Sequence, residues 1–274
     1  MAKLKIKPLQ TFKEYEACVA VQRQVWHHDD LDITPIHQFC VSVETGGILL
    51  GAFLGGKMVG YVYSFPAVLG GKHCQHSHHL AVLPEVQGLG LGKKLKWAQR
   101  EEVLRREYDL ITWTFDPMLT RNANLNLHAL GAVAWAYVDN FYGYTPSLVL
   151  EAGVPTDRLL VEWWIRTRRV EQKRKQKNGG SNLRKIAAAV EQKSGGRYPD
   201  IFPARPNLSL DEKKILIELP RNIRDLKGRS GLVAAWQAAV RTALGHYFAA
   251  GYRAVDFICD ERCFYVLKKE RSIS

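Results

Sequence analysis

The sequence predicts an α/β fold, and three observations lead to that class. Strand and helix signals alternate between residues 77 and 138, in the order strand, glycine loop, helix, strand, helix, strand. Two earlier apolar runs are separated by Gly55-Gly56, which is a hairpin signal. Apolar residues make up 46% and aromatic residues 10% of the 274 residues, so the chain can build a sizeable core.

The elements follow from turn residues and periodicity along the chain. Thr11 has the side chain of a helix N-cap and precedes a helix that runs through about Trp26. Leu91, Leu95 and Ala98 share one face of a later helix. The expected elements are strands over 4–8, 49–54, 58–65, 77–83, 110–115, 133–138 and 159–165, with helices over 12–26, 91–107 and 121–130.

A change in composition at residues 166–180 predicts a domain boundary. This segment is dense in Arg, Lys and Gln and ends in Asn178-Gly179-Gly180, as in a solvated linker or a frayed helix end. We therefore expect a core over 1–165 and a small α/β extension over 181–274. The extension's long helix, about 230–250, is apolar over most of its surface. It should dock on the core or form a homodimer contact.

The termini and cysteines indicate the compartment. Residues 1–8 are basic but lack a following apolar stretch, so they predict no secretory signal. Nothing approaches the roughly 18 apolar residues that a membrane span needs. The cysteines are odd in number and scattered, which favours free thiols in a reducing cytoplasm. They are Cys18, Cys40, Cys74, Cys259 and Cys263.

The loop from Gln87 to Gly92 is typical of phosphate binding, and its spacing excludes two common patterns. A dinucleotide fingerprint would need glycine at Lys93 or Leu95. A P-loop ending at Lys93 would need glycine at Gln87 and Ser or Thr at Lys94. Both patterns fail.

The pattern that fits is Q/R-x-x-G-x-G/A, at Gln87, Gly90 and Gly92. Glycines let the backbone approach a pyrophosphate, and the N-terminus of the following helix favours the same anion. Lys93 and Lys94 oppose the helix dipole unless an anion lies there. The alternative is a loose turn between strand and helix. Residues 80–92 resemble the signature of the GNAT acyltransferase superfamily, from its fourth strand into its third helix.

The resemblance covers residues 4–165 and implies a mixed, splayed sheet flanked by helices. The fourth and fifth strands would separate to admit the pantetheine arm of acetyl-CoA, which would pair with backbone groups near Leu80 and Val82. It implies an N-acetyltransferase that moves an acetyl or short acyl group from coenzyme A to an amine of a small molecule or peptide, by direct attack. The expected coenzyme A contacts of the loop are Gln87, Gly88, Leu89, Gly90, Leu91, Gly92 and Lys93.

The sequence departs from the family pattern in the next helix. That helix often reads N-x-x-A-x-x-x-Y-x-x-x-G-F, and its Tyr is the general acid. Ala123 and Gly131 align with this pattern, which places Leu127 at the Tyr position. Asn124 should share a helical face with Leu127 and could contact coenzyme A instead. The alternative is an ordinary polar residue near a helix N-terminus.

The histidines of segment 73–79 are the candidates for a general base. On a strand, His76 and His78 would share a face with Leu80 and Val82, with pKa values suited to a base near neutral pH. A zinc or nickel site and a partly exposed hairpin end are the alternatives. We assign His76 and His78 as catalytic and expect no metal.

The formal net charge of +12 indicates an acidic partner, which coenzyme A or nucleic acid would satisfy. The basic run over 166–177 follows Trp163 and Trp164, which belong to an apolar strand rather than a stacking platform. A solvated face is the default interpretation of this run, and a nucleic-acid-associated basic protein is a less favoured alternative. A coenzyme A-binding regulatory module that has lost catalysis is the other alternative.

Overall fold

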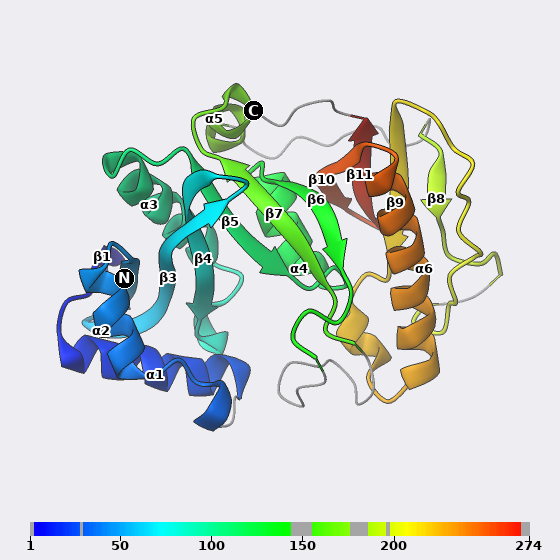
Figure 1. The fold of residues 1–274 in the computed structure, drawn as a ribbon. Coiled ribbons are helices and arrows are strands. Elements are labelled where there is room, and N and C mark those ends of the chain that lie inside the picture. The colour runs from blue at the N-terminus through cyan, green and yellow to red at the C-terminus, as the bar shows by residue number, and fades with distance from the viewer. Residues whose placement is uncertain (1–2, 28–29, 144–154, 176–185, 196–197, 270–274) are drawn as a thin grey trace. The chain divides into compact units, whose positions relative to one another are not determined.

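The structure is a computed structural model that describes residues 3–27, 30–143, 155–175, 186–195 and 198–269. The chain forms two compact units, residues 1–113 and 114–274. Each unit combines mostly antiparallel strands with flanking helices (Figure 1), which confirms the predicted α/β class. No helix in the described part of the chain is both long enough and apolar enough to cross a bilayer.

The sheet of the first unit follows the order of the chain. Its strands are β1 (Lys5–Pro8), β2 (Ile48–Leu54), β3 (Lys57–Leu69), β4 (Lys72–Val82) and β5 (Leu110–Phe115). Strands β1 to β4 pair in antiparallel fashion, and β5 pairs with β4 in parallel. The β2–β3 turn uses Gly55 and Gly56 at positive φ, as the hairpin signal predicted.

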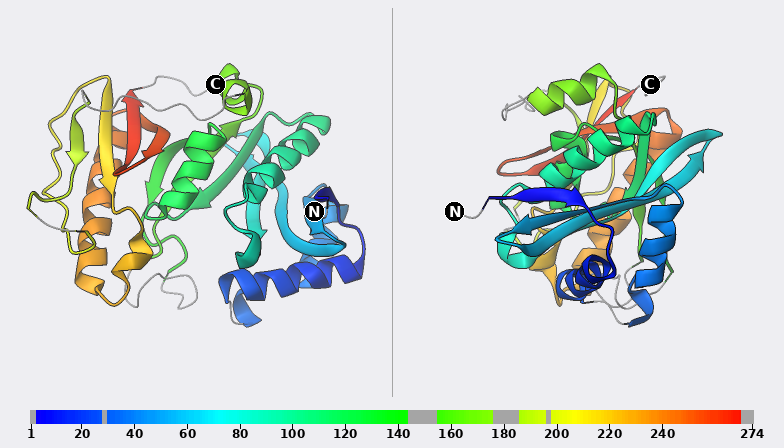
Figure 2. Two further views of the ribbon diagram at one scale, coloured as in Figure 1. Left: turned by 180° about the vertical axis from the view of Figure 1, so that it is seen from behind. Right: turned by 90° about the vertical axis from the view of Figure 1, so that its left-hand side faces the viewer.

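Helices cover both faces of this sheet (Figure 2). They are α1 (Phe12–Trp26), α2 (Ile36–Glu44) and α3 (Leu91–Arg105). Thr11 and Glu14 form a capping box at the start of α1, so the predicted N-cap is confirmed. Phe39 of α2 packs on Tyr61 and Tyr63 of β3, whereas α3 contacts Ser77 on the opposite face of the sheet.

The second unit contains further strands, helices and helical turns. The strands lie in the order β7 (Arg158–Trp164), β6 (Val133–Val138), β10 (Tyr252–Cys259), β11 (Cys263–Lys269), β9 (Lys214–Leu219) and β8 (Ala188–Val190). The helices are α4 (Thr120–Ala123), which continues as a π-helix (Asn124–Ala129), α5 (Arg168–Lys175) and α6 (Ser230–Ala249). Gly131 follows the π-helix at a φ of +75°, where a left-handed residue ends the helix.

The predicted extension contacts part of the predicted core within this unit. Ala254 of β10 pairs with Ala134 of β6. Arg241 of α6 forms a 2.7 Å ion pair with Asp157, whose side chain is fully buried. The boundaries at 165 and 180 remain a prediction, and residues 176–180 of the expected linker lie outside the described residues.

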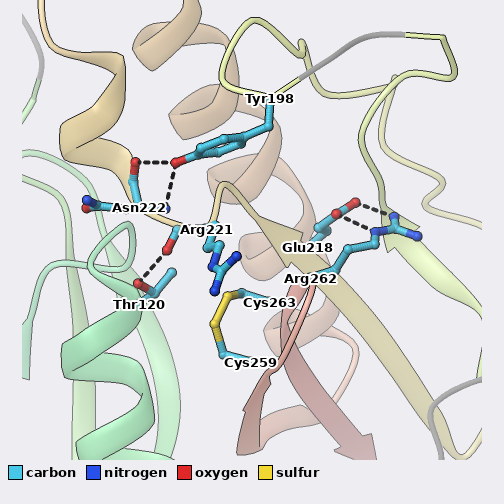
Figure 3. Close-up of a disulfide and its surroundings, with 8 residues drawn as sticks. All are labelled: Thr120, Tyr198, Glu218, Arg221, Asn222, Cys259, Arg262 and Cys263. Atoms are coloured by element: carbon cyan, nitrogen blue, oxygen red, sulfur yellow. Dashed lines mark hydrogen bonds and ion pairs between the residues drawn. A yellow bond between two sulfur atoms is a disulfide. The ribbon is translucent and has the colours of Figure 1, made fainter.

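The hairpin of β10 and β11 is closed by a disulfide between Cys259 and Cys263 (Figure 3). The two residues lie directly opposite each other in the register of the strands. The expectation of free thiols is therefore wrong for this pair, because chain reversal brings together two cysteines four positions apart. Cys18, Cys40 and Cys74 are free thiols, as expected.

Candidate active site

Strand β4 carries a β-bulge at His78. In the pairing with β3, Tyr63 lies opposite His79 and Ser64 lies opposite Ser77, so His78 is an extra residue on β4. A bulge shifts the alternation of side chains by one position. The side chains of β4 therefore alternate between the two faces of the sheet in one sense before His78 and in the opposite sense after it.

For this reason, the prediction that His76 shares a face of the sheet with Leu80 and Val82 is wrong. His76 lies opposite Phe65 and Leu80 lies opposite Val62. Phe65 and Val62 are three residues apart on β3, so they occupy opposite faces. His76 therefore lies on the face of α1 and α2, and Leu80 and Val82 lie on the face of α3.

Strands β4 and β5 pair over a short stretch and then separate. The parallel register joins Gln75 to Ile111 and His76 to Thr112. Among the described residues no further pair joins the two strands, although β4 continues to Val82. The edge of β4 beyond His76 thus carries backbone groups that an extended ligand can pair with.

The end of this edge is tied to the glycine loop. The backbone N–H of Leu83 donates to Val59 of β3, so the neighbouring Val82 directs its backbone groups to the other side. The Nε2 group of Gln87 donates to the carbonyl of Val82 at 2.8 Å. Gln87 therefore positions the loop against the strand. The backbone groups of Leu80, two residues before Val82, point to the same unpaired edge of β4.

The loop has the conformation that its glycines predicted. Gly88 and Gly90 have φ values of +84° and +74°, which disfavour any side chain. A Cβ atom built on either glycine meets no atom within 4 Å, so space is open above the loop. Gly90 also occupies the N-cap position of α3.

The charges around the loop favour an anion. The first turn of α3 contains no acidic residue, and Lys93 and Lys94 follow the loop directly. Backbone N–H groups at a helix N-terminus and two ammonium groups attract phosphate. The residues present thus fit the pyrophosphate of coenzyme A, with the edge of β4 available for its pantetheine arm.

His76 is held as a neutral imidazole. Its Nδ1 atom lies 3.1 Å from Oγ1 of Thr112 on β5, at the last pair of the two strands. Burial, with the neighbouring charges of His78 and Lys96, lowers the pKa of His76 to about 4. The expected pKa near neutrality is wrong for His76, because desolvation disfavours the imidazolium.

His78 and His79 stack at the bulge, with ring centroids 4.3 Å apart. Although His78 is exposed at the surface, desolvation by neighbouring rings lowers its pKa. The Nδ1 atom of His79 lies 2.9 Å from the buried hydroxyl of Tyr61, and Trp26 of α1 packs on the His79 ring. His79 was not singled out from the sequence, because its place in this cluster depends on the bulge.

A metal site at these histidines finds no support. No group of three or more His, Cys, Asp or Glu side chains in the described parts of the chain is arranged to hold a metal ion. Cys74, the sulfur ligand in that alternative, is fully buried.

Lys96 is a further polar residue beside the strand gap, and no sequence pattern indicated it. It is 2% exposed and projects from α3 towards β4 and β5. Its Nζ donates to Oγ of Ser77 at 2.9 Å and to Oε1 of Gln99 at 2.7 Å. It also lies 3.9 Å from the centre of the Trp113 ring. A lysine in an amphipathic helix is expected at the surface, so only the packing in the structure shows that Lys96 is buried.

The second unit contains Leu127 and Asn124. Leu127 is fully buried and therefore has a core role. Asn124 is exposed. The predicted shared face of these residues is wrong, because residues 124–129 form a π-helix whose wider turn separates positions i and i+3. Contact of Asn124 with coenzyme A stays a prediction.

The glycine loop thus lies between the fourth strand and helix α3, beside two parallel strands that separate. Residues 10–132 match the model of the Acetyltransferase (GNAT) family. This part of the chain thus carries a GNAT-family domain, and the resemblance is confirmed for it. No curated protein sequence matches the chain.

Solved structures of this class share the fold. The structure of yncA from Salmonella typhimurium, with its cofactor acetyl-CoA, is 15% identical, with a TM-score of 0.50 over 66% of this chain and 99% of that one. The ribosomal-protein-S18-alanine N-acetyltransferase from Escherichia coli is 17% identical, with a TM-score of 0.48 over 60% of this chain and 96% of that one. At these identities the likeness extends to the fold alone.

Proposed function

We propose that the protein transfers an acetyl or short acyl group from coenzyme A to an amine, by direct attack in a ternary complex. The observation that carries this proposal is the loop at Gly88 and Gly90, which opens helix α3 directly beside the unpaired edge of β4. The GNAT match over residues 10–132 supports the same reaction class. The acetyl-CoA named for the Salmonella typhimurium protein supports the cosubstrate.

Binding and orientation are the first tasks of the chain. The backbone N–H groups of the loop, with Lys93 and Lys94, would hold the pyrophosphate. The backbone groups of Leu80 and Val82 would orient the pantetheine arm along β4. When bound, acetyl-CoA supplies an acyl group activated as a thioester. The acceptor is a small-molecule or peptide amine.

Proton removal from the amine is the task of the imidazoles. His76 and His78 are neutral at pH 7, because desolvation lowers both pKa values. When Nδ1–H of His76 donates to Thr112, the lone pair on Nε2 is available for a proton. General-base help contributes about 10²- to 10⁴-fold when the pKa of the base lies near the operating pH, and the lowered pKa of His76 places its contribution towards the smaller of these values.

A coenzyme A-binding module without catalysis is the second candidate function. Leu127 favours it, since a fully buried leucine at the usual Tyr position cannot donate a proton. Loss of a general acid costs about 10²- to 10⁴-fold, which a good leaving group partly offsets because a thiolate needs little protonation. Transfer therefore remains the leading proposal.

The experiment uses the purified full chain. Native mass spectrometry of the protein should reveal co-purified coenzyme A or acyl-CoA. Incubation with acetyl-CoA and a panel of primary amines should then release coenzyme A thiol and yield an acetylated amine. Binding without transfer to any amine would favour the regulatory module, and absence of binding would contradict both.

A further inference from the structure

The gap between β4 and β5 has a defined inner end. The last pair of the two strands joins His76 to Thr112. The next residue on each strand is Ser77 on β4 and Trp113 on β5. A chain that paired with the edge of β4 from Val82 inward would therefore reach Ser77 and Trp113 before the strands close.

Lys96 contacts both of these residues. Its Nζ atom hydrogen bonds to Ser77 at 2.9 Å and lies 3.9 Å from the centre of the Trp113 ring. Ser77 also donates to Oε1 of Gln99 at 3.1 Å, so Lys96, Ser77 and Gln99 form a closed polar triangle. Helix α3, which begins at the glycine loop, is thereby linked to the inner end of the gap.

Burying the polar groups of Lys96 and Gln99 costs free energy, so filling space in the core does not by itself explain them. Desolvation lowers the pKa of Lys96 well below its usual range. Lys96 and Gln99 are both buried, and Nε2 of Gln99 has no hydrogen-bond partner among the described residues. An apolar side chain would avoid the cost of burying an amine, whereas a lysine is held in place across the gap by its hydrogen bonds to Ser77 and Gln99. Within this cluster, Nε2 of Gln99 is thus a buried donor that no acceptor among the described residues uses.

We propose that Lys96 is a positioning residue that closes the inner end of the β4–β5 gap and limits the length of the acyl group that the site accepts. This inference rests on the proposed function, because it assumes that acyl-CoA lies along β4. It also predicts an effect across β4, since Lys96 and His78 are the charged or titratable neighbours that depress the protonation of His76.

The test compares Lys96→Met with Lys13→Met, the same change at an exposed lysine of helix α1. Calorimetry gives the Kd of acetyl-CoA and of hexanoyl-CoA for each protein. We expect the wild type and Lys13→Met to bind hexanoyl-CoA at least tenfold more weakly than acetyl-CoA. In Lys96→Met this ratio should fall to threefold or less. An unchanged ratio in folded Lys96→Met overturns the proposal.

A second measurement needs no ligand and tests the effect of Lys96 on His76 across β4. NMR titration of the His76 imidazole in the free protein should show a higher pKa in Lys96→Met than in wild type and Lys13→Met. If wild type binds neither acyl-CoA, the proposed function fails. This proposal then fails with it, whereas binding with an unchanged Kd ratio rejects this proposal alone.

Ser77→Ala covers the case in which Lys96→Met does not fold. It removes one hydrogen bond of Lys96 and retains the amine. We expect the hexanoyl-to-acetyl Kd ratio to fall by at least twofold relative to the wild type. A ratio equal to that of the wild type would count against the proposal.

Discussion

His76 makes the stability of the protein depend on pH in a defined window. Its folded pKa of about 4 lies below the 6.5 of a free imidazole. Between these values the unfolded state binds the proton and the folded state does not, so stability falls as pH drops from 6.5 towards 4. The difference corresponds to about 3 kcal/mol.

Chemical denaturation between pH 4 and 8 measures this effect. The free energy of unfolding should be flat above about pH 6.5 and should fall below it. His76→Gln removes the titrating ring, so its curve should fall less steeply than that of the wild type. Parallel curves would show that His76 is not the group responsible.

The same pKa shifts determine the pH range in which the transfer rate falls on the acid side of its pH–rate profile. Both imidazoles are neutral above about pH 6.5. Protonation of the base should therefore not lower the transfer rate between about pH 6.5 and pH 8. His76→Ala or His78→Ala should lower the rate by about 10²- to 10⁴-fold and alter the acid limb. If both variants keep the wild-type pH–rate profile, the base is a carboxylate or water elsewhere.

The residues of the candidate site differ in how far the sequence could predict them. The conformation of the loop at Gly88 and Gly90 follows from local spacing and was predicted. The positions of His76 and His79 depend on a bulge set by the pairing with β3, and no local pattern marks it. Lys96 is buried only because β4 and β5 pack over it.

At the scale of elements, the β10–β11 hairpin carries a testable disulfide. Intact mass measured without reductant should rise by about 2 Da on reduction, because two hydrogen atoms are added. The cysteines are separated by four positions, and so short a loop contributes about 2 kcal/mol at most by loop entropy.

Cys259→Ser supplies the control for the hairpin. This variant should show no change of mass on reduction, and alkylation should label Cys263 together with Cys18, Cys40 and Cys74. Labelling of Cys259 in the denatured, unreduced wild type would contradict the pairing.

Most elements were predictable because their signals are local. The capping box at Thr11, the turn at Gly55 and Gly56 and the end of the helix at Gly131 all match the structure. The π-helix over 124–129 was not predictable, since its hydrogen bonds reflect packing rather than residue type. The cross-strand cysteine pair likewise depends on the register of β10 and β11.

At the scale of the molecule, the ion pair of Arg241 and Asp157 links helix α6 to the start of β7. Asp157 is fully buried and also accepts a hydrogen bond from Tyr137, so loss of Arg241 leaves a buried carboxylate without its cation. Since Arg241 is about one-third exposed, we expect Arg241→Met to cost about 2 kcal/mol of unfolding free energy. Asp139→Asn, at a 63% exposed partner 3.7 Å from Arg241, should cost under about 0.5 kcal/mol. Equal costs for the two variants would contradict this role.

A chain that ends at Gly180 extends this test. It lacks α6, β10 and β11, so β6 loses its pairing with β10 and Asp157 loses Arg241. We expect such a chain to be insoluble or to have a markedly lower Tm than the full chain. A monomer of equal Tm and activity would show that residues 181–274 are a separate module.

The overall class was predictable from the sequence, whereas the grouping of elements into units was not. The order of strands and helices around the glycine loop indicated the α/β fold. The pairing of β6 with β10 joins positions more than a hundred residues apart, and no local pattern encodes it.

Binding of acetyl-CoA at the glycine loop is the central claim, and calorimetry on Gly90→Glu tests it most directly. Gly90 has a φ of +74° with open space above it, so the new carboxylate would lie where the phosphate must approach. Gly71→Glu is the matched control, because Gly71 has a φ of +79° and equally open space in the β3–β4 turn. Wild type and Gly71→Glu should bind acetyl-CoA equally, and Gly90→Glu at least tenfold more weakly. Equal affinity in all three folded proteins would contradict the assignment.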